Sequence, residues 1–184
     1  MAIYNTASDI ANTAVRAFLT KIGELYLGRS FNVSNGIAQR DWHKIRDEVF
    51  NKKCAYCGKS EPILQMDHLI MFNKTGYGLH HPGNIAPVCK RCNTRTKNKS
   101  GEYNSWEDHL SHICETSNEK DKFIDRWNKI KRHISEGEFA YPKLTDEENN
   151  TLRIITSTLY RNIKTEFDNA IELYREFGKN ITKP

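Results

Sequence analysis

Apolar residues recur every three or four positions near the start of the chain, which is the period of an amphipathic helix. The pattern predicts a helix over residues 6–27 and a second, shorter helix over residues 39–50. Residues 28–38, which lie between the two, are rich in glycine, serine and asparagine and are therefore predicted to form a loop.

The helical period is lost between residues 54 and 97, where short apolar runs alternate with glycines. Residues 63–66 and residues 69–72 are two such runs, and a glycine-containing loop follows them at residues 73–78. This pattern predicts a pair of strands joined by that loop, and then a short helix from about residue 90.

The helical period returns in the second half of the chain, where helices are predicted over residues 105–116, 118–135 and 145–177. Thr145 and Glu148 match a capping box at the start of the last helix. The apolar stripe of that helix consists of Leu152, Ile155, Leu159, Ile163, Phe167, Ile171 and Tyr174. Because the helix exceeds the ~8–20 residues usual in globular proteins, we expect either that it braces the rest of the chain or that its stripe pairs with a second copy.

The composition limits the class of protein. The 184 residues are 38% hydrophobic and 28% charged, which allows a buried core and excludes a wholly disordered or collagen-like chain. No apolar stretch approaches the ~20 residues of a membrane-spanning helix, and residues 1–6 lack the features of a secretory signal. We therefore expect a cytoplasmic protein with one core and no membrane partner.

Positive charge is concentrated in the middle of the chain. The whole chain carries a net charge of +5, whereas residues 40–100 alone hold 12 Lys and Arg against 5 Asp and Glu. Such a basic segment between nearly neutral and slightly acidic flanks indicates a polyanionic partner. The alternative interpretation is a basic surface that contacts only solvent.

Four of the five cysteines form two pairs of identical spacing, Cys54 with Cys57 and Cys89 with Cys92. Two-residue spacing lets two thiolates reach the same zinc ion at ~2.3 Å. In a chain without a secretory signal, two such pairs are more typical of a tetrahedral structural zinc site than of disulfides. The remaining cysteine, Cys114, lies in a helical pattern and is predicted to be a small buried apolar residue.

Further polar residues lie between and beside the cysteine pairs. Asp67 and His68 fall on the first predicted strand, and Asn84 and Asn93 follow. Lys97 is expected one helical turn beyond Asn93, on the same face of the predicted helix. If one zinc ion binds both cysteine pairs, that helix folds back against the strand and brings these residues into one candidate site.

In order and spacing, these residues resemble the zinc-stabilised branch of the HNH (His-Me finger, or ββα-metal) endonuclease family. The matching elements are Cys54-x-x-Cys57, Met66-Asp67-His68, Gly83-Asn84-Ile85, Cys89-x-x-Cys92-Asn93 and Lys97. The resemblance implies an α+β protein in which a zinc-bound ββα-metal core at residues 51–100 is flanked by helical segments at residues 1–50 and 101–184.

The resemblance also implies a role for each matching residue. His68 corresponds to the general base that activates water, and Asn84 to the residue that holds the loop and the His-bearing strand. Asp67 and Asn93 correspond to ligands of one catalytic Mg²⁺, with Mn²⁺ as an alternative. Asn93 stands where other members have histidine, which suits an oxygen-preferring ion. Lys97 replaces a second histidine, so we expect it to contact phosphate.

The chemistry of these side chains agrees with those roles. An imidazole with an ordinary pKa near 6.5 can take a proton from water at neutral pH. The cations expected to contact a nucleic-acid backbone are Lys90, Arg91, Arg95, Lys97 and Lys99. His80 and His81 are alternative metal ligands, although surface histidines are the simpler expectation. For Trp42, Tyr56 and Tyr77, packing in the core or in loops is expected rather than contact with bases.

We therefore expect a metal-dependent DNA endonuclease that acts on double-stranded DNA, of the type II restriction class, and a homodimer. The resemblance implies products with 5′-phosphate and 3′-hydroxyl ends. The main competing interpretation is a non-enzymatic zinc module that binds nucleic acid, although binding alone has no use for Asp67, His68 and Asn93 together. A homing or nicking nuclease and an RNA-directed nuclease are also consistent with these residues.

Overall fold

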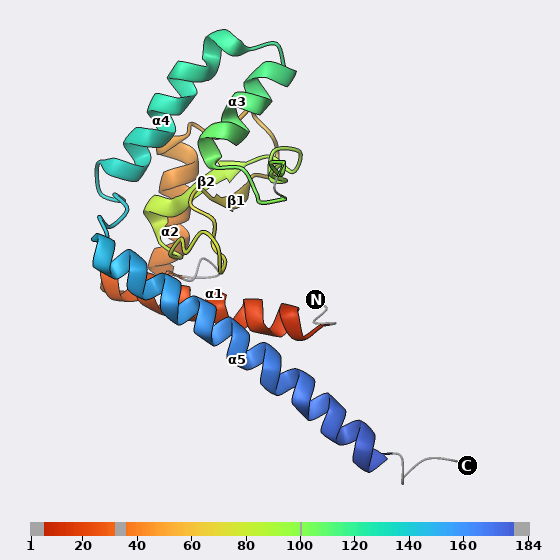
Figure 1. Ribbon diagram of the computed structural model, residues 1–184. Coiled ribbons are helices and arrows are strands. Elements are labelled where there is room, and N and C mark those ends of the chain that lie inside the picture. Colours follow the sequence, from red (N-terminus) through yellow and green to blue (C-terminus); the bar gives the residue numbers. More distant parts are fainter. Residues whose placement is uncertain (1–5, 32–35, 100, 179–184) are drawn as a thin grey trace.

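The computed structural model describes residues 6–31, 36–99 and 101–178. Within these residues the chain is mostly helical and carries one two-stranded antiparallel sheet, which confirms the expected α+β class. The sheet lies between two helical layers, with α3 and α4 on one side and α1 and α5 on the other (Figure 1). None of the helices in the described ranges is long and apolar enough to span a membrane.

The first helix, α1, spans Ala7–Leu27 as predicted. Thr6 caps it, because its hydroxyl accepts the Asp9 N–H at 3.2 Å while the Asp9 carboxylate accepts the Thr6 N–H at 3.1 Å. The helix ends at Gly28, whose φ of 72° lies in the left-handed region that glycine adopts without strain.

The second helix begins earlier than predicted. Helix α2 spans Gly36–Lys44 and continues directly into a π-helical turn, η1, at Ile45–Val49. The predicted loop 28–38 is therefore shorter, because its last three residues are already helical. Residues 32–35 of that loop lie outside the described residues.

Strand β1 (Gln65–His68) pairs with β2 (Ile85–Val88), and His68 lies opposite Ile85. The prediction that Asp67 and His68 lie on the first strand is confirmed. The second apolar run, residues 69–72, is not a strand, because it turns away from β1 to fill two separate parts of the interior. Leu69 packs among the cysteines, whereas Phe72 packs between α1 and α5.

The predicted helix from residue 90 does not form, since residues 90–99 are turns and extended chain. Asparagine, threonine, serine and glycine dominate residues 93–101, and all have low helix propensity. Lys97 instead pairs with Tyr103 in an isolated antiparallel bridge. The expectation that Lys97 lies one helical turn beyond Asn93 is therefore wrong.

The three predicted C-terminal helices are present, although α4 begins five residues later than the predicted start at residue 118. Helix α3 spans Trp106–Thr116, α4 spans Phe123–Ser135, and α5 spans Asp146–Gly178. Short 3₁₀ turns at Pro82–Asn84 (η2) and Lys120–Lys122 (η3) precede β2 and α4. The predicted capping box is present at α5, where the Glu148 N–H donates to the Thr145 hydroxyl at 3.2 Å and the Glu148 carboxylate accepts the Thr145 N–H at 2.7 Å.

The main core surrounds the two cysteine pairs. Residues from all three predicted segments pack into it, including Ile45, Phe50, Tyr56, Leu69, Leu110 and Ile130, each at most 2% exposed. Cys114 is also in this cluster and is 1% exposed, which confirms its expected place in the core.

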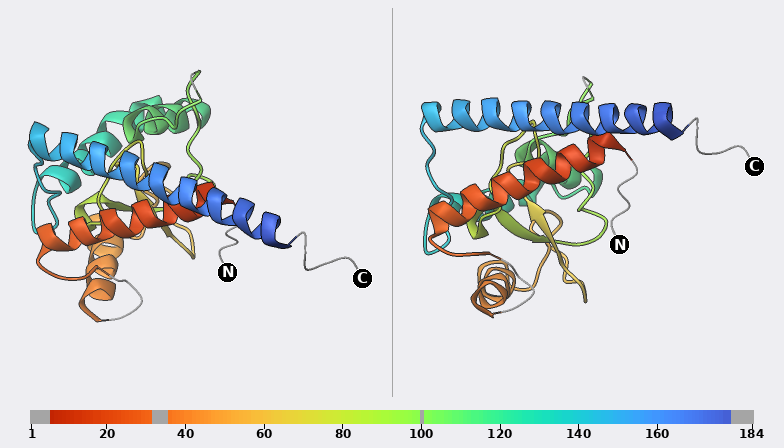
Figure 2. Two further views of the ribbon diagram at one scale, coloured as in Figure 1. Left: turned by 60° about the horizontal axis from the view of Figure 1, so that its bottom comes forward. Right: turned by 90° about the horizontal axis from the view of Figure 1, so that it is seen from below.

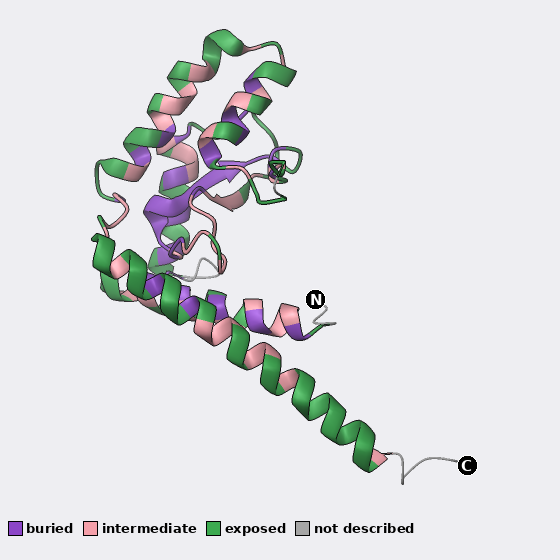
Figure 3. Cartoon of the chain, viewed as in Figure 1, coloured by how far each residue is buried: buried purple, intermediate pink, exposed green. Residues whose placement is uncertain are grey.

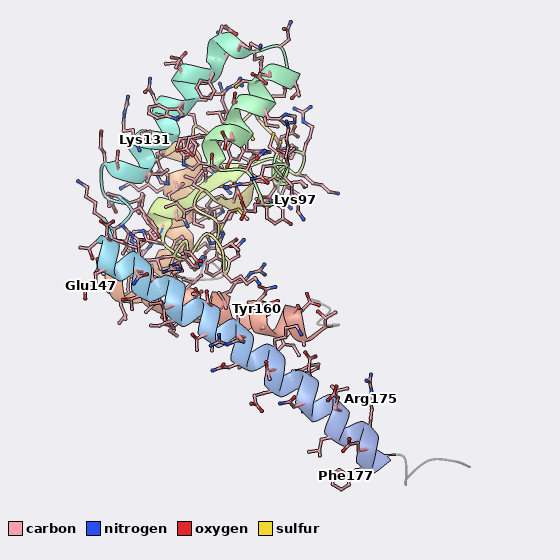
Figure 4. All side chains as sticks on the ribbon, in the orientation of Figure 1. Lys97, Lys131, Glu147, Tyr160, Arg175 and Phe177 are labelled. Carbon is pink, nitrogen blue, oxygen red and sulfur yellow. The ribbon has the colours of Figure 1, made fainter. Side chains whose placement is uncertain are left out.

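A second core joins α1 to α5. The two helices run antiparallel and side by side (Figures 1 and 2), and Val15, Leu19, Leu79 and Leu152 are buried between them and the 69–84 connection. The Tyr160 hydroxyl reaches the Ser8 hydroxyl at 3.1 Å where α5 crosses the start of α1 (Figure 4). The second half of α5 extends beyond α1 and is largely exposed (Figure 3). The helix therefore braces α1.

We predict that Leu19→Ala lowers the free energy of unfolding by about 2–5 kcal/mol, because it leaves a cavity where α1 meets α5. Leu19 is 0% exposed, whereas Leu25 on the same helix is 75% exposed. The matched variant Leu25→Ala should therefore stay within about 0.5 kcal/mol of the parent. Denaturant titration of the two variants checks this, and equal stabilities would contradict the packing.

Candidate functional site

The four paired cysteines converge on one point. Cys54 and Cys57 lie before β1 and Cys89 and Cys92 lie directly after β2, so the sheet itself brings the pairs together. The four Sγ atoms lie within 4.8 Å of one another, and all four cysteines are buried. The donor set is thus closed and all-thiolate, which fits a structural zinc ion.

Backbone hydrogen bonds shape each pair into a tight turn. In the first pair, the Gly58 N–H donates to the Cys54 carbonyl at 2.9 Å, and the φ of Gly58 is 68°, a value that favours glycine. In the second pair, the N–H groups of Cys92 and Asn93 donate to the Cys89 carbonyl at 3.0 and 3.1 Å. The turns aim both sulfurs of a pair toward the same centre.

Asp67 is held on the side of β1 that faces the second cysteine pair. Its Oδ2 accepts hydrogen bonds from the Tyr56 hydroxyl at 2.7 Å and from Arg95 Nη2 at 3.0 Å. The Asp67 side chain is 13% exposed and that of Arg95 is 4% exposed. The carboxylate is thus paired with a buried cation in the interior of the site.

Arg95 does not lie on the surface where contact with phosphate was expected. Its Nη2 also lies within hydrogen-bond distance of the main-chain oxygens of His68 at 2.6 Å and Leu69 at 2.9 Å. The guanidinium therefore holds the end of β1 from inside the protein. Removing it would leave the Asp67 charge unpaired in a nearly buried position, which is strongly destabilising.

Two residues that the sequence did not single out for this site connect Asp67 to the cysteines. Burial and the negative charge of Asp67 raise the pKa of Tyr56, so its hydroxyl stays protonated and donates to the carboxylate. The ring of His109 meets that of Tyr56 edge-on at 4.7 Å, and its Nε2 lies 2.9 Å from the Cys92 carbonyl oxygen. Helix α3, which carries His109, thereby joins the second cysteine pair to Asp67.

His68 points to the other face of β1, because successive strand residues alternate. Its half-buried ring stacks on Phe72 with centroids 4.4 Å apart, and its Nε2 lies 3.0 Å from His80 Nδ1. Burial, followed by the positive charges of His80, Arg16 and Arg95, lowers the pKa of His68 to about 3. The imidazole is therefore neutral at physiological pH and has a lone pair that can accept a proton, but in this state it is a weaker base than the expected pKa near 6.5 implies.

His80 and His81, which lie in the connection between the two strands, are not surface residues. His81 is 4% exposed and caps the short turn before β2, where its Nδ1 accepts the Gly83 N–H at 3.1 Å. His80 is half-buried between His68 and Phe31, with its Nε2 2.9 Å from the Phe31 carbonyl oxygen. The expectation of exposed histidines is wrong because the 69–84 connection is packed under α1 and α5.

Asn84 is fully buried and ties together both ends of the connection between the strands. Its Oδ1 accepts the Ile70 N–H at 2.7 Å, and its Nδ2 donates to the carbonyls of Ile70 and Leu79, each at 2.9 Å. A Cβ at Gly78 would lie 2.1 Å from the Ile70 oxygen, so only glycine fits beside this bonded pair. The bonds fix the chain immediately after His68.

Asn93 lies beside the start of β1. Its Nδ2 donates to Gln65 Oε1 at 2.9 Å, which leaves its own amide oxygen available as a donor to a metal ion. Gln65 and Asp67 are two residues apart on one strand and so share a face of the sheet. Asp67 Oδ1 and the amide oxygen of Asn93 are oxygen donors of the kind that Mg²⁺ prefers.

The exposed cations near the site are fewer than expected. Lys90, Arg91, Lys97 and Lys99 are exposed, and only Arg95 of the predicted set is buried. The Lys97 side chain projects from the loop after the second cysteine pair, with its Nζ 5.1 Å from the Tyr103 ring centroid (Figure 4). Trp42 and Tyr56 pack in the core and Tyr77 packs at its edge, as expected.

We predict about one zinc ion per purified chain and its loss in Cys57→Ser. Because zinc binding supplies ~10 kcal/mol or more of folding free energy in small zinc modules, this variant should unfold at a lower temperature. Cys114→Ala removes a buried cysteine of the same core that is outside the cluster, so its zinc content should stay unchanged. Metal analysis and thermal unfolding check both; a folded parent protein without zinc would contradict the site.

Comparison with known proteins finds a family model that matches the segment around the cysteines. The family model described as HNH endonuclease matches residues 54–99, a segment that contains both cysteine pairs, both strands, Asp67, His68, Asn84 and Asn93. No curated protein and no solved structure matches the chain. The resemblance inferred from the sequence is thus confirmed: residues 54–99 match the HNH endonuclease model. This match implies nuclease activity on nucleic acid, and the four cysteines of the segment can hold a zinc ion.

Proposed function

We propose that the protein is a metal-dependent endonuclease that hydrolyses phosphodiester bonds in double-stranded DNA, with His68 as the general base. The observation that carries the proposal is the placement of His68 within the matched segment. Its ring is fixed between Phe72 and His80 at the end of β1, and Asn84 fixes the chain immediately beyond it. A base restrained in this way meets the requirement of positioned proton transfer.

We propose Asp67 and Asn93 as the ligands of a catalytic Mg²⁺, on the basis of their available oxygens. When bound, a divalent ion stabilises negative charge that develops on the phosphate and on the leaving oxygen. Arg95 partly neutralises Asp67 in this arrangement and so weakens its attraction for a cation. Two protein ligands leave most coordination positions to water and phosphate, as is usual for Mg²⁺.

DNA would be bound by the exposed lysine and arginine side chains after the second cysteine pair. Lys90, Arg91, Lys97 and Lys99 lie within ten residues and belong to the most basic part of the chain. Such contacts to phosphate are independent of base sequence and weaken as salt increases. We further propose that the protein is a type II restriction enzyme, because helical segments on both sides of the matched segment pack against it.

We predict that His68→Ala lowers the cleavage rate by roughly 10²–10⁴-fold, the usual contribution of a positioned base. DNA affinity should change little, because binding rests on contacts between basic side chains and phosphates. The measurement is plasmid cleavage with Mg²⁺, together with DNA binding at matched salt, for zinc-loaded parent and variant. Equal cleavage rates would remove the base assignment.

Lys97→Ala is the matched control for that experiment and should behave in the opposite way. It removes one exposed cation, so DNA binding should weaken. The slope of the logarithm of DNA affinity against the logarithm of salt concentration should become shallower by about one. Binding of DNA without cleavage by the parent protein on any DNA tested would favour a non-enzymatic zinc module.

We also propose a homodimer formed through the projecting half of α5, since cleavage of both DNA strands is served by two active sites. That half exposes Leu173 by 55%, Tyr174 by 74% and Phe177 by 65%, and these residues lie outside both cores. The same region carries the end of the predicted apolar stripe.

We predict that Leu173→Glu combined with Phe177→Glu converts a dimer into a monomer in sedimentation experiments, with an unchanged unfolding temperature. A charge at these positions opposes burial of the surface between two copies. The control is Leu25→Glu, which places the same charge on an exposed leucine of α1. A parent protein that is monomeric both free and bound to DNA would contradict the dimer.

A further inference from the structure

Three polar groups from distant parts of the chain form a line of hydrogen bonds that ends at His68. The Phe31 carbonyl oxygen lies 2.9 Å from His80 Nε2, and His80 Nδ1 lies 3.0 Å from His68 Nε2. Phe31 follows α1, His80 belongs to the connection between the strands, and His68 ends β1. This line lies on the face of β1 away from Asp67.

The positions of the hydrogens along this line follow from the chemistry of the groups. A carbonyl oxygen only accepts, so His80 must carry its hydrogen on Nε2. A neutral imidazole has one N–H, so His80 Nδ1 is an acceptor. Burial lowers the pKa of His80, which keeps the ring neutral, although the Phe31 carbonyl opposes this. His68 must then donate from its own Nε2.

We propose that His80 is a positioning residue that fixes His68 in the Nε2–H tautomer, so that His68 Nδ1 is the atom that takes the proton from water. This inference rests on the proposed function and names the nitrogen that acts. In the step itself, an O–H bond of water breaks and a bond forms between that hydrogen and Nδ1. The water oxygen then bonds to phosphorus, and the leaving oxygen departs with the electron pair of the broken P–O bond.

His80 also interacts with the protonated form of His68 that this step produces. Once Nδ1 is protonated, the ring of His68 carries a positive charge, and its Nε2–H donates a stronger, charge-assisted hydrogen bond to His80 Nδ1. A neutral His80 therefore favours the charged form of His68 that arises during proton transfer, whereas a protonated His80 would oppose it. The same ring, if turned or lost, would leave the Nε2–H of a half-buried histidine without this acceptor.

The fold fixes His80 from two sides. Its ring lies 5.1 Å from that of Phe31 and 5.6 Å from that of Phe72, measured between centroids. Its backbone lies against α1 at Gly23, where an added Cβ would be 2.3 Å from the His80 carbonyl oxygen. Helix α1 and Phe31, which precede the matched segment 54–99, thus complete the surroundings of the base.

The direct test is the tautomer of His68, read from long-range ¹H–¹⁵N correlations of the zinc-loaded protein with ¹⁵N-labelled imidazoles. We expect the Nε2–H form in the parent. In His80→Phe, which keeps an aromatic ring but removes the acceptor, we expect that preference to be lost. His80→Asn offers an amide oxygen near the position of Nδ1 and should restore it in part. A parent in the Nδ1–H form, or an unchanged tautomer in His80→Phe, would overturn the inference.

Kinetics supply the second readout. His80→Phe should lower kcat on the order of 10–100-fold with little change in KM, as is typical when a supporting hydrogen bond to a functional histidine is removed, and His80→Asn should recover part of that loss. His112→Phe, at an exposed histidine of α3, is the matched control and should leave kcat unchanged. An unchanged kcat in a folded His80→Phe would overturn the positioning role. Absence of cleavage by the parent would instead refute the proposed function, whereas the tautomer is measured without DNA.

Discussion

The convergence of four cysteine sulfurs on one point, where they can hold a zinc ion, is the constraint on which the rest of the site depends. Each strand of the sheet has only four residues, and a two-stranded sheet of this size is marginal in water. The two cysteine turns flank the sheet, and the Ala55 N–H donates to the Pro87 carbonyl at 2.8 Å, which ties the first turn to β2. A zinc ion there would close the 31-residue connection between Cys57 and Cys89, and its binding energy would be folding energy.

Strand β1 separates the site into two halves with different surroundings. On one face, Asp67 is joined through Tyr56 and His109 to the second cysteine turn, and Arg95 neutralises its charge. On the other face, His68 contacts His80, which is in turn held by the Phe31 carbonyl. The core around the four cysteines therefore positions the carboxylate, and the N-terminal helical layer positions the imidazole. Because successive side chains of β1 lie on opposite faces of the strand, the carboxylate and the imidazole have separate surroundings.

Features that depend on neighbouring residues could be predicted from the sequence. Capping chemistry predicts the start of α5 after Thr145, and the period of the apolar residues predicts the bounds of α1. The cysteine spacing alone predicts the zinc site. Features that depend on distant contacts could not. Arg95 looks like a surface cation within its basic run, and its burial follows from Asp67, which lies 28 residues earlier.

The same physical reason explains the errors in the middle of the chain. Residues 69–72 are apolar enough for a strand, but their side chains fill two cores that only the complete fold creates. The pattern of apolar and polar residues predicts a helix from about residue 90, although the helix propensity of the residues that follow the second cysteine pair is low. His80 lies 49 residues from Phe31, its partner, and no local pattern marks that contact.

X-ray absorption at the zinc edge of the purified protein tests the central claim most directly, because it reports the ligands of the ion itself. We expect a single shell of four sulfur atoms at ~2.3 Å, supplied by Cys54, Cys57, Cys89 and Cys92. A shell that includes nitrogen or oxygen ligands would contradict the claim that these four thiolates alone hold the ion and thereby the strand that carries Asp67 and His68.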